Sequence, residues 1–256
     1  MRGTSLLLLA CLSATATPAA VPAFADNMAQ RTLACTSCHG REGRAGPDGY
    51  YPRIAGKPEG YLYNQLLHFR DGRRHYGLMA GLLEPLSNEY LHEIARHFAR
   101  QDVPYPAPQA SALAPAVLQR GRVIALQGDA ERRLPACASC HGKALTGVEP
   151  NVPGLLGLPR DYLNAQLGAW RTGQRRAHAP DCMADIARAL QPADLSAVTA
   201  WLAAEPVPAN AKPVALASAQ AAAPARRKGR VAAPPAPEAP TPRCGSAPLP
   251  QAGSRP

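Results

Sequence analysis

The chain carries one short sequence motif twice, roughly a hundred residues apart. Residues 35–40 read Cys-Thr-Ser-Cys-His-Gly, and residues 137–142 read Cys-Ala-Ser-Cys-His-Gly. Further residues match at nearly the same offset: Tyr61, Gln65, Phe69 and Met79 follow the first copy, and Tyr162, Gln166, Trp170 and Met183 follow the second. Self-similarity at a fixed interval is typical of repeated structural units. The sequence therefore predicts two copies of one fold.

Apolar residues in both units recur at helical spacing. The last such stripe of each unit comprises Leu91, Ile94 and Phe98 in the first and Leu195, Val198 and Leu202 in the second. Few segments alternate as strands do, so the expected fold class is all-α. Proline is frequent from residue 104 to residue 108, where it stops a helix from continuing. We therefore expect one domain over residues 26–104 and a second over residues 112–205.

The first 25 residues have the features of a signal peptide. A charged start and a short apolar run precede Ala23-Phe24-Ala25, which has the small residues of a cleavage site. The run is too short to span a bilayer, so we expect an exported chain that begins near Asp26 and resides in the periplasm. A second interpretation stays open: Leu8-Leu9-Ala10-Cys11 resembles a lipoprotein box, and cleavage there would leave a lipid anchor on Cys11.

The formal net charge of +10 is concentrated near the end of the chain. Seven basic residues and one acidic residue follow residue 205, and Arg2 belongs to the leader, so residues 26–205 carry only +3. This distribution argues against a nucleic-acid-binding body. Residues 206–256 are rich in alanine and proline and poor in large apolar side chains, so we expect them to form a disordered basic tail.

The repeated Cys-x-x-Cys-His motif is typical of covalent haem attachment. Two thiols at this spacing form thioethers with the two vinyl groups of a haem, and the next histidine ligates the iron. The thioether residues are then Cys35, Cys38, Cys137 and Cys140, and the iron ligands are His39 and His141. A zinc site would need two cysteine pairs brought together, and a thioredoxin-like disulfide would need a βαβ pattern, which is absent. We expect two covalent haem c groups.

One methionine in each unit is a candidate for the sixth iron ligand. Met79 and Met183 occupy the same place in the repeat, in a loop rich in glycine, proline and arginine before the final helix. Ligation by histidine and methionine gives a comparatively high reduction potential. His75 and His178 lie a few residues upstream and are the competing ligands. We expect them to be solvated loop residues.

A proline follows each ligand histidine at nearly the same distance. Pro52 lies 13 residues after His39, and Pro153 lies 12 residues after His141. A ligating histidine normally donates its other N–H to a fixed acceptor. The two proline carbonyls are our candidates for that acceptor.

At these residues, over about 30–205, the chain resembles the dihaem class I cytochromes c of the cytochrome c4 type. The resemblance implies two tandem cytochrome c domains related by a pseudo-twofold axis, with His/Met ligation at both irons and propionates that approach one another. Such proteins are periplasmic carriers that are soluble or associate peripherally with a membrane. The basic tail is not part of that pattern. We expect a monomer.

The expected function is one-electron transfer between a respiratory donor and a terminal oxidase or another acceptor, without enzymatic activity. Its partners would be redox proteins, such as a membrane oxidase or a dehydrogenase. Two alternatives remain: a dedicated cytochrome subunit of a dehydrogenase complex, and a dihaem redox enzyme such as a peroxidase or a thiosulfate-oxidising protein. The enzyme would need one haem with an open or displaceable sixth position, and the two matched methionines argue against that.

Two cysteines stand outside the motifs, Cys182 directly before Met183 and Cys244 in the tail. An oxidising compartment permits a disulfide between them. The sequence leaves three states open: a disulfide, free thiols, or pairing between molecules.

Overall fold

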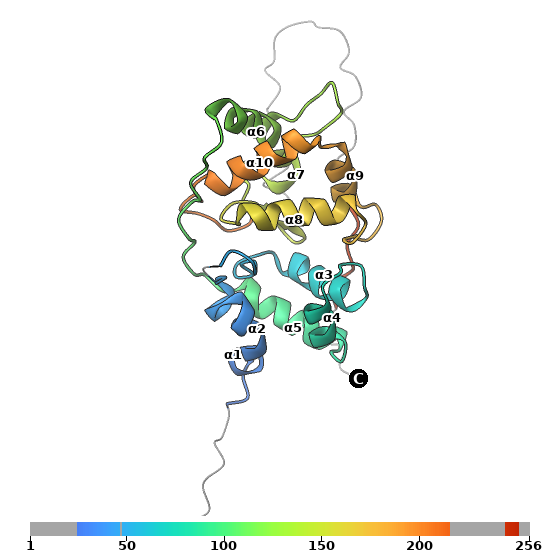
Figure 1. The fold of residues 1–256 in the computed structure, drawn as a ribbon. Coiled ribbons are helices and arrows are strands. Elements are labelled where there is room, and N and C mark those ends of the chain that lie inside the picture. The colour runs from blue at the N-terminus through green and yellow to red at the C-terminus, as the bar shows by residue number, and fades with distance from the viewer. Residues whose placement is uncertain (1–24, 47, 216–243, 251–256) are drawn as a thin grey trace, which may run out of the picture.

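The computed structural model of the protein describes residues 25–46, 48–215 and 244–250 (Figure 1). The predicted leader with its Cys11, and residues 216–243 and 251–256 of the predicted tail, lie outside the described residues. None of the helices in the described part of the chain combines the length and the apolar character that crossing a bilayer requires.

The first unit consists of helices, and its motif lies on the second of them. In chain order the helices are α1 (Met28–Arg31), α2 (Leu33–His39), the 3₁₀ turn η1 (Arg41–Gly43), α3 (Glu59–Arg70), α4 (Gly77–Leu83) and α5 (Asn88–Ala99). The stripe of Leu91, Ile94 and Phe98 on α5 is buried against apolar residues of α3, as the sequence predicts. Ser87 caps α5, because its hydroxyl accepts a hydrogen bond from the Tyr90 N–H at 3.2 Å.

The second unit repeats the order of the helices, with a longer first helix and with a strand pair in place of the 3₁₀ turn. Its elements are α6 (Pro115–Gln127), α7 (Cys137–His141), β1 (Gly147–Val148), β2 (Val152–Pro153), α8 (Arg160–Arg171), α9 (Cys182–Ala189) and α10 (Pro192–Ala204). The two strands form one short antiparallel pair, so the prediction of an all-α fold holds apart from this pair. Close packing joins α6 to α10, where a side chain on Gly121 would meet the Ala197 carbonyl oxygen at 2.2 Å.

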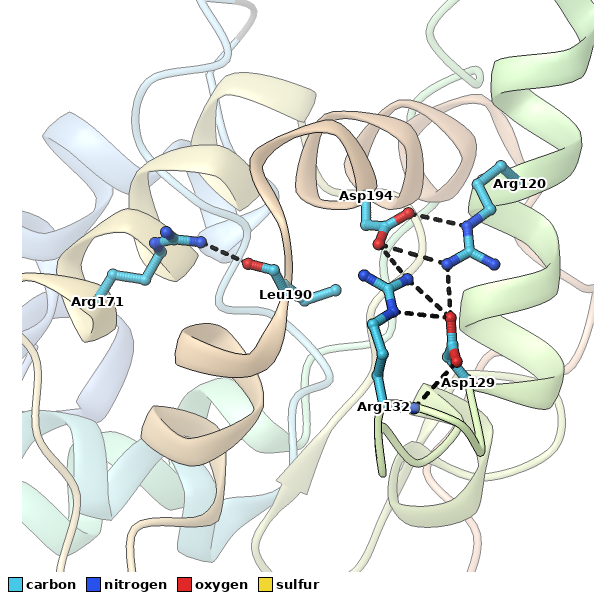
Figure 2. Close-up of polar contacts among 6 residues, drawn as sticks. All are labelled: Arg120, Asp129, Arg132, Arg171, Leu190 and Asp194. Atoms are coloured by element: carbon cyan, nitrogen blue, oxygen red, sulfur yellow. Dashed lines mark hydrogen bonds and ion pairs between the residues drawn. The ribbon is translucent and has the colours of Figure 1, made fainter.

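An ion-pair cluster of Arg120, Asp129, Arg132 and Asp194 fixes α6 against α10 (Figure 2). The Arg120 guanidinium donates to Asp194 and to Asp129 at 2.8 Å each, and Arg132 donates to Asp129 at 2.7 Å. The hydrogen bonds from Arg120 and Arg132 lower the pKa of Asp129 to about 2. Because Asp194 lies in the first turn of α10 and Arg120 lies on α6, the cluster sets the register of the two helices.

The two units also share a hydrogen bond between the third helix and the residues that precede the last helix. The Arg171 guanidinium at the end of α8 donates to the Leu190 carbonyl at 2.6 Å, as Figure 2 shows. The matching Arg70 at the end of α3 donates to the Leu86 carbonyl at 3.1 Å. The same contact at matched positions supports the prediction that the chain duplicates one unit.

The two units meet with α3 facing α8 (Figure 1), and their contacts obey a pseudo-twofold relation. The His75 N–H donates to the Gln174 carbonyl at 2.8 Å, and the Arg176 N–H donates to the Arg73 carbonyl at 2.7 Å. These two bonds exchange partners when each residue is replaced by its counterpart 101 positions along the chain. Arg74 and Arg175 pair at the centre of this antiparallel contact.

Two parts of the predicted tail contact the body, which the prediction of a wholly disordered tail did not anticipate. The Val214 N–H donates to the Gly147 carbonyl at 3.0 Å, and the Glu149 N–H donates to the Val214 carbonyl at 2.9 Å, so residue 214 extends the small strand pair. Residues 244–250 return to the junction of the two units. In each place hydrogen-bonding partners on the body fix a segment whose composition alone favours disorder.

Candidate functional site

A cavity of about 860 Å³ is lined by residues of both units. Its walls include both motifs and both candidate methionines: Cys35, Cys38, His39, Pro52 and Met79 from the first unit, and Cys137, Cys140, His141, Pro153 and Met183 from the second. The structure therefore brings every site residue that the sequence predicts to one continuous space.

Short helices present the thiols of both motifs. In α2 and α7 the two cysteines are three residues apart, so they lie on one helix face. None of the four thiols forms a disulfide. Burial raises the pKa of Cys35, and it raises the pKa of Cys137 to about 11, so these thiols stay protonated at neutral pH. Within the described residues, no three His, Cys, Asp or Glu side chains gather so as to hold a metal ion.

Each motif histidine is buried and fixed by a proline carbonyl. His39 Nδ1 lies 2.9 Å from the Pro52 oxygen, and His141 Nδ1 lies 2.7 Å from the Pro153 oxygen. A carbonyl oxygen only accepts, so Nδ1 carries the proton and Nε2 keeps its lone pair for a ligand. Burial lowers the pKa of both imidazoles, so both rings are held neutral, as ligation requires.

The two methionines lie in short helices, where the sequence predicts loops. Met79 belongs to the first turn of α4 and Met183 to the first turn of α9, and each side chain is half-buried against the cavity. The Asp181 carboxylate caps α9 by accepting from the Ala184 N–H at 3.1 Å. A cap and a run of helix-forming residues therefore turn the segment around Met183 into a helix.

The competing histidines have different surroundings. His75 is exposed and reaches the cavity edge. His178 packs against His68 of the other unit, with ring centroids 5.1 Å apart, and is not among the cavity residues. The expectation of a solvated loop residue holds for His75, whereas His178 belongs to the junction of the units.

A pair of arginines at the cavity was missed by sequence reasoning. Arg175 is 4% exposed, and its guanidinium donates to Gln65 at 2.8 Å and to Gln166 at 2.9 Å. Arg74 donates to the same two glutamines, at 3.0 and 2.7 Å. Each arginine thus bonds to both units. The two positions match in the repeat, after Gly72 and Gly173, so a longer comparison of the two copies would have found them.

The arginine pair has cationic character without a protein counter-ion. Among the ion pairs of the described residues, none includes Arg74 or Arg175. Burial, and then the positive charge of Arg74, lower the pKa of Arg175. Two neighbouring guanidiniums with only neutral partners favour an anion in the adjoining cavity, because a carboxylate binds a guanidinium in a bidentate, charge-assisted arrangement.

These residues fit a haem. The cavity supplies a large space with mainly apolar walls, two thiols for covalent attachment in each unit, and a neutral imidazole with a free Nε2. The arginine pair matches the carboxylates that a haem carries. The Trp170 Nε1 atom is buried without a hydrogen-bond partner at the same cavity, which leaves it available to a polar edge of the cofactor.

Comparison with known proteins gives consistent relatives, although no family model matches the chain. It is 37% identical over 191 residues to a thiosulfate dehydrogenase electron acceptor of Thiomonas intermedia, covering 73% of this chain and 86% of the relative. It is 30% identical over 174 residues to cytochrome c4 of Pseudomonas aeruginosa, covering 67% of this chain and 84% of the relative. The crystal structure of reduced cytochrome c4 from Pseudomonas stutzeri superposes with a TM-score of 0.59 at 28% identity, covering 69% of this chain and 95% of that one.

Proposed function

The chain belongs to the cytochrome c4 family of c-type cytochromes, and from this premise we propose that it holds two haem c groups, one in each unit, and transfers electrons singly between redox proteins. The family identifies it as an electron-transfer protein rather than an enzyme. One observation supports the proposal that the chain binds two haems. Both copies of the motif present the same set of thiols, fixed histidine and methionine to the cavity.

The chain's own residues have defined roles in this proposal. When bound, each haem supplies an iron that cycles between the ferrous and ferric states. The thiols of Cys35 and Cys38 anchor one haem, and those of Cys137 and Cys140 anchor the other. His39 and His141 ligate through Nε2, while Pro52 and Pro153 hold the opposite ring nitrogens. Met79 and Met183 complete the two coordination shells and exclude water and other ligands from the iron.

The arginine pair has an electrostatic role. We assign Arg74 and Arg175 to the haem carboxylates, because they are cations at the cavity with only neutral protein partners. A nearby positive charge favours the electron-rich ferrous state and raises the reduction potential. Since each arginine contacts both units, removal of one is expected to affect both haems.

Replacement of the buried arginine tests this role. Arg175→Gln is expected to lower the potentials of both haems by on the order of tens of millivolts, because a cation is lost from a site of low polarity. Potentiometric titration followed by absorbance measures both values. The neighbouring Arg176→Gln removes the same charge from an exposed side chain and is the matched control, with a smaller expected shift. A lowered potential at only one haem would show that the pair is not shared.

We propose thiosulfate dehydrogenase as the electron donor. The relative from Thiomonas intermedia is named as an electron acceptor of that enzyme, and it is more similar to this chain than the cytochrome c4 of Pseudomonas aeruginosa is. This assignment favours the alternative of a dehydrogenase-associated cytochrome.

A reduction experiment tests the donor. Oxidised protein mixed with thiosulfate and a catalytic amount of thiosulfate dehydrogenase is expected to take up two electrons per chain, seen as growth of the reduced haem absorbance. Thiosulfate alone is the control and should leave the protein oxidised over the same period. If the enzyme reduces ferricyanide under these conditions but leaves this protein oxidised, thiosulfate dehydrogenase is not its donor.

The oligomeric state, the location and the domain bounds that we propose are those that the sequence predicts. We propose a monomer in the periplasm, with cleavage after Ala25, a first domain over residues 26–104 and a second over residues 112–205. The separate buried clusters of the two units support this division, since one draws on α3 and α5 and the other on α6, α8 and α10. Mass spectrometry of the mature chain tests the cleavage site and also detects a lipid on Cys11.

A further inference from the structure

A segment near the end of the chain is fastened to the loop that precedes Met183. Residues 244–250, which we call the strap, begin with Cys244, and this residue forms a disulfide with Cys182. The Gly245 N–H donates to the Pro180 carbonyl at 2.9 Å, and Gly245 also forms an antiparallel bridge with His178. One covalent bond and backbone pairing therefore hold the residues immediately before Met183.

The geometry leaves no room for a side chain at Gly245, the second residue of the strap. A Cβ atom on Gly245 would lie 2.3 Å from the His178 oxygen and 2.4 Å from the Ala179 oxygen. The backbone of the strap thus lies directly on the backbone of the loop. The strap therefore packs closely against the backbone of residues 178–180, in addition to being linked to Cys182 by the disulfide.

The strap continues onto the first unit. The Ala247 N–H donates to Asn64 Oδ1 at 2.8 Å, and Ala247 packs against the apolar cluster of that unit. Asn64 is 5% exposed on α3, and its amide nitrogen donates to the Gly60 carbonyl at 2.7 Å, which fixes the orientation of the side chain. The strap therefore connects the loop before Met183 to a rigid, buried anchor on the other unit.

Among the residues that the structure describes, no equivalent segment holds the residues before Met79 in the first unit. Leu78 occupies the place of Cys182, directly before Met79, and its side chain is 69% exposed. The chain elsewhere duplicates its contacts closely, as the bonds of Arg70 and Arg171 to matched carbonyls illustrate. The strap is therefore a difference between two otherwise similar sites, and it lies at the residue beside each candidate ligand.

We propose that Cys244 and the strap are positioning elements for Met183, which keep the sixth position of the second haem closed while that of the first exchanges more readily. The inference rests on the ligation proposed above. A methionine leaves the iron only when its segment moves away, and such local opening is limited by the contacts that must break. For Met183 the segment is bonded to the strap, and the strap is bonded to the first unit. For Met79 the preceding residue is exposed.

Ligand exchange in the oxidised holoprotein tests the proposal. Imidazole is added, and its binding is followed by loss of the weak near-infrared methionine–iron band. The wild type is expected to show a faster phase from the first unit and a slower phase from the second. Cys182→Ser combined with Cys244→Ser should accelerate the slow phase by on the order of tenfold, because opening then breaks fewer contacts, and should leave the fast phase unchanged. Leu78→Ser, at the matching place in the first unit, is the control.

A second variant keeps the test decisive if the double variant folds poorly. A chain that ends at residue 243 and carries Cys182→Ser removes the strap entirely and should give the same acceleration. An unchanged slow phase in both variants, with the methionine band intact before imidazole is added, would overturn the positioning role and leave the proposed function standing. A wild-type protein with no methionine band would instead contradict the ligation on which the inference rests.

Discussion

A chain in which Cys137 and Cys140 are both replaced by alanine is expected to carry one haem and to lose the folded structure of its second unit. The cavity of about 860 Å³ occupies the position of a core, and both units line it. An unfilled cavity costs about 24 cal/mol per Å³, which gives on the order of 20 kcal/mol for the whole and about half of that for one unit. Small domains are stable by only about 5–15 kcal/mol, so a loss of this size is expected to unfold the second unit.

The measurement combines the mass of the purified chain with its circular dichroism. The variant should gain the mass of one haem only, and its helical signal should fall by the contribution of α6 to α10. Cys182→Ser combined with Cys244→Ser is the matched control, since it also replaces two cysteines, one in the second unit and one in the strap, but should keep both haems. Full helical content in the Cys137/Cys140 variant would show that the fold does not depend on the cofactor.

Met183→Ala is expected to lower the reduction potential of one haem by a few tenths of a volt, within the roughly 0.8 V range that axial ligands span. A thioether stabilises the ferrous state, and its loss admits water or another ligand. Attachment should persist, because the thiols of Cys137 and Cys140 and the ligand His141 are untouched. Met79→Ala should give the same result at the other haem.

Potentiometric titration and the near-infrared methionine–iron band check this expectation. Each single variant should lose half of the band and shift one of two potentials. Met28→Leu is the control, because Met28 packs against the first apolar cluster and is not proposed as a ligand. Unchanged potentials with a full band in Met183→Ala would exclude Met183 as a ligand.

Much of the site could be predicted because the same residue types occur at matching positions in both units. The Cys-x-x-Cys-His motif predicts the thioether cysteines and the ligand histidines. The methionine at the matching place in each unit predicts the other iron ligand. The hydrogen bonds from the histidines to Pro52 and Pro153 are local, since they close loops of 13 and 12 residues. Spacing within one unit was enough to predict these contacts.

The contacts between units were harder to predict from the sequence. Arg74, which is half-buried, and Arg175, which is buried, are held by glutamines of the opposite unit. Composition alone assigns such arginines to a solvated loop. Helices α4 and α9 were predicted as loops because glycine, proline and arginine surround them. The local backbone of these segments depends on caps such as Asp181 and on packing against the cavity.

The contacts of the tail were also difficult to predict from the sequence. Residues 206–256 have the composition of a disordered segment, yet Val214 pairs with the small sheet and Cys244 bonds to Cys182, 62 residues away. Sequence left the state of these cysteines open, because spacing does not determine a disulfide between distant residues. In the structure, Cys182 and Cys244 form a disulfide.

The central claim is that each unit holds a haem through two thioethers, and the denatured mass of the intact chain tests it most directly. Thioethers survive denaturation, whereas a haem held by ligation alone is released. Protein made in a host that matures c-type cytochromes is predicted to weigh its mature polypeptide plus two haem groups. A mass equal to the polypeptide alone, or to the polypeptide plus one haem, would contradict the account.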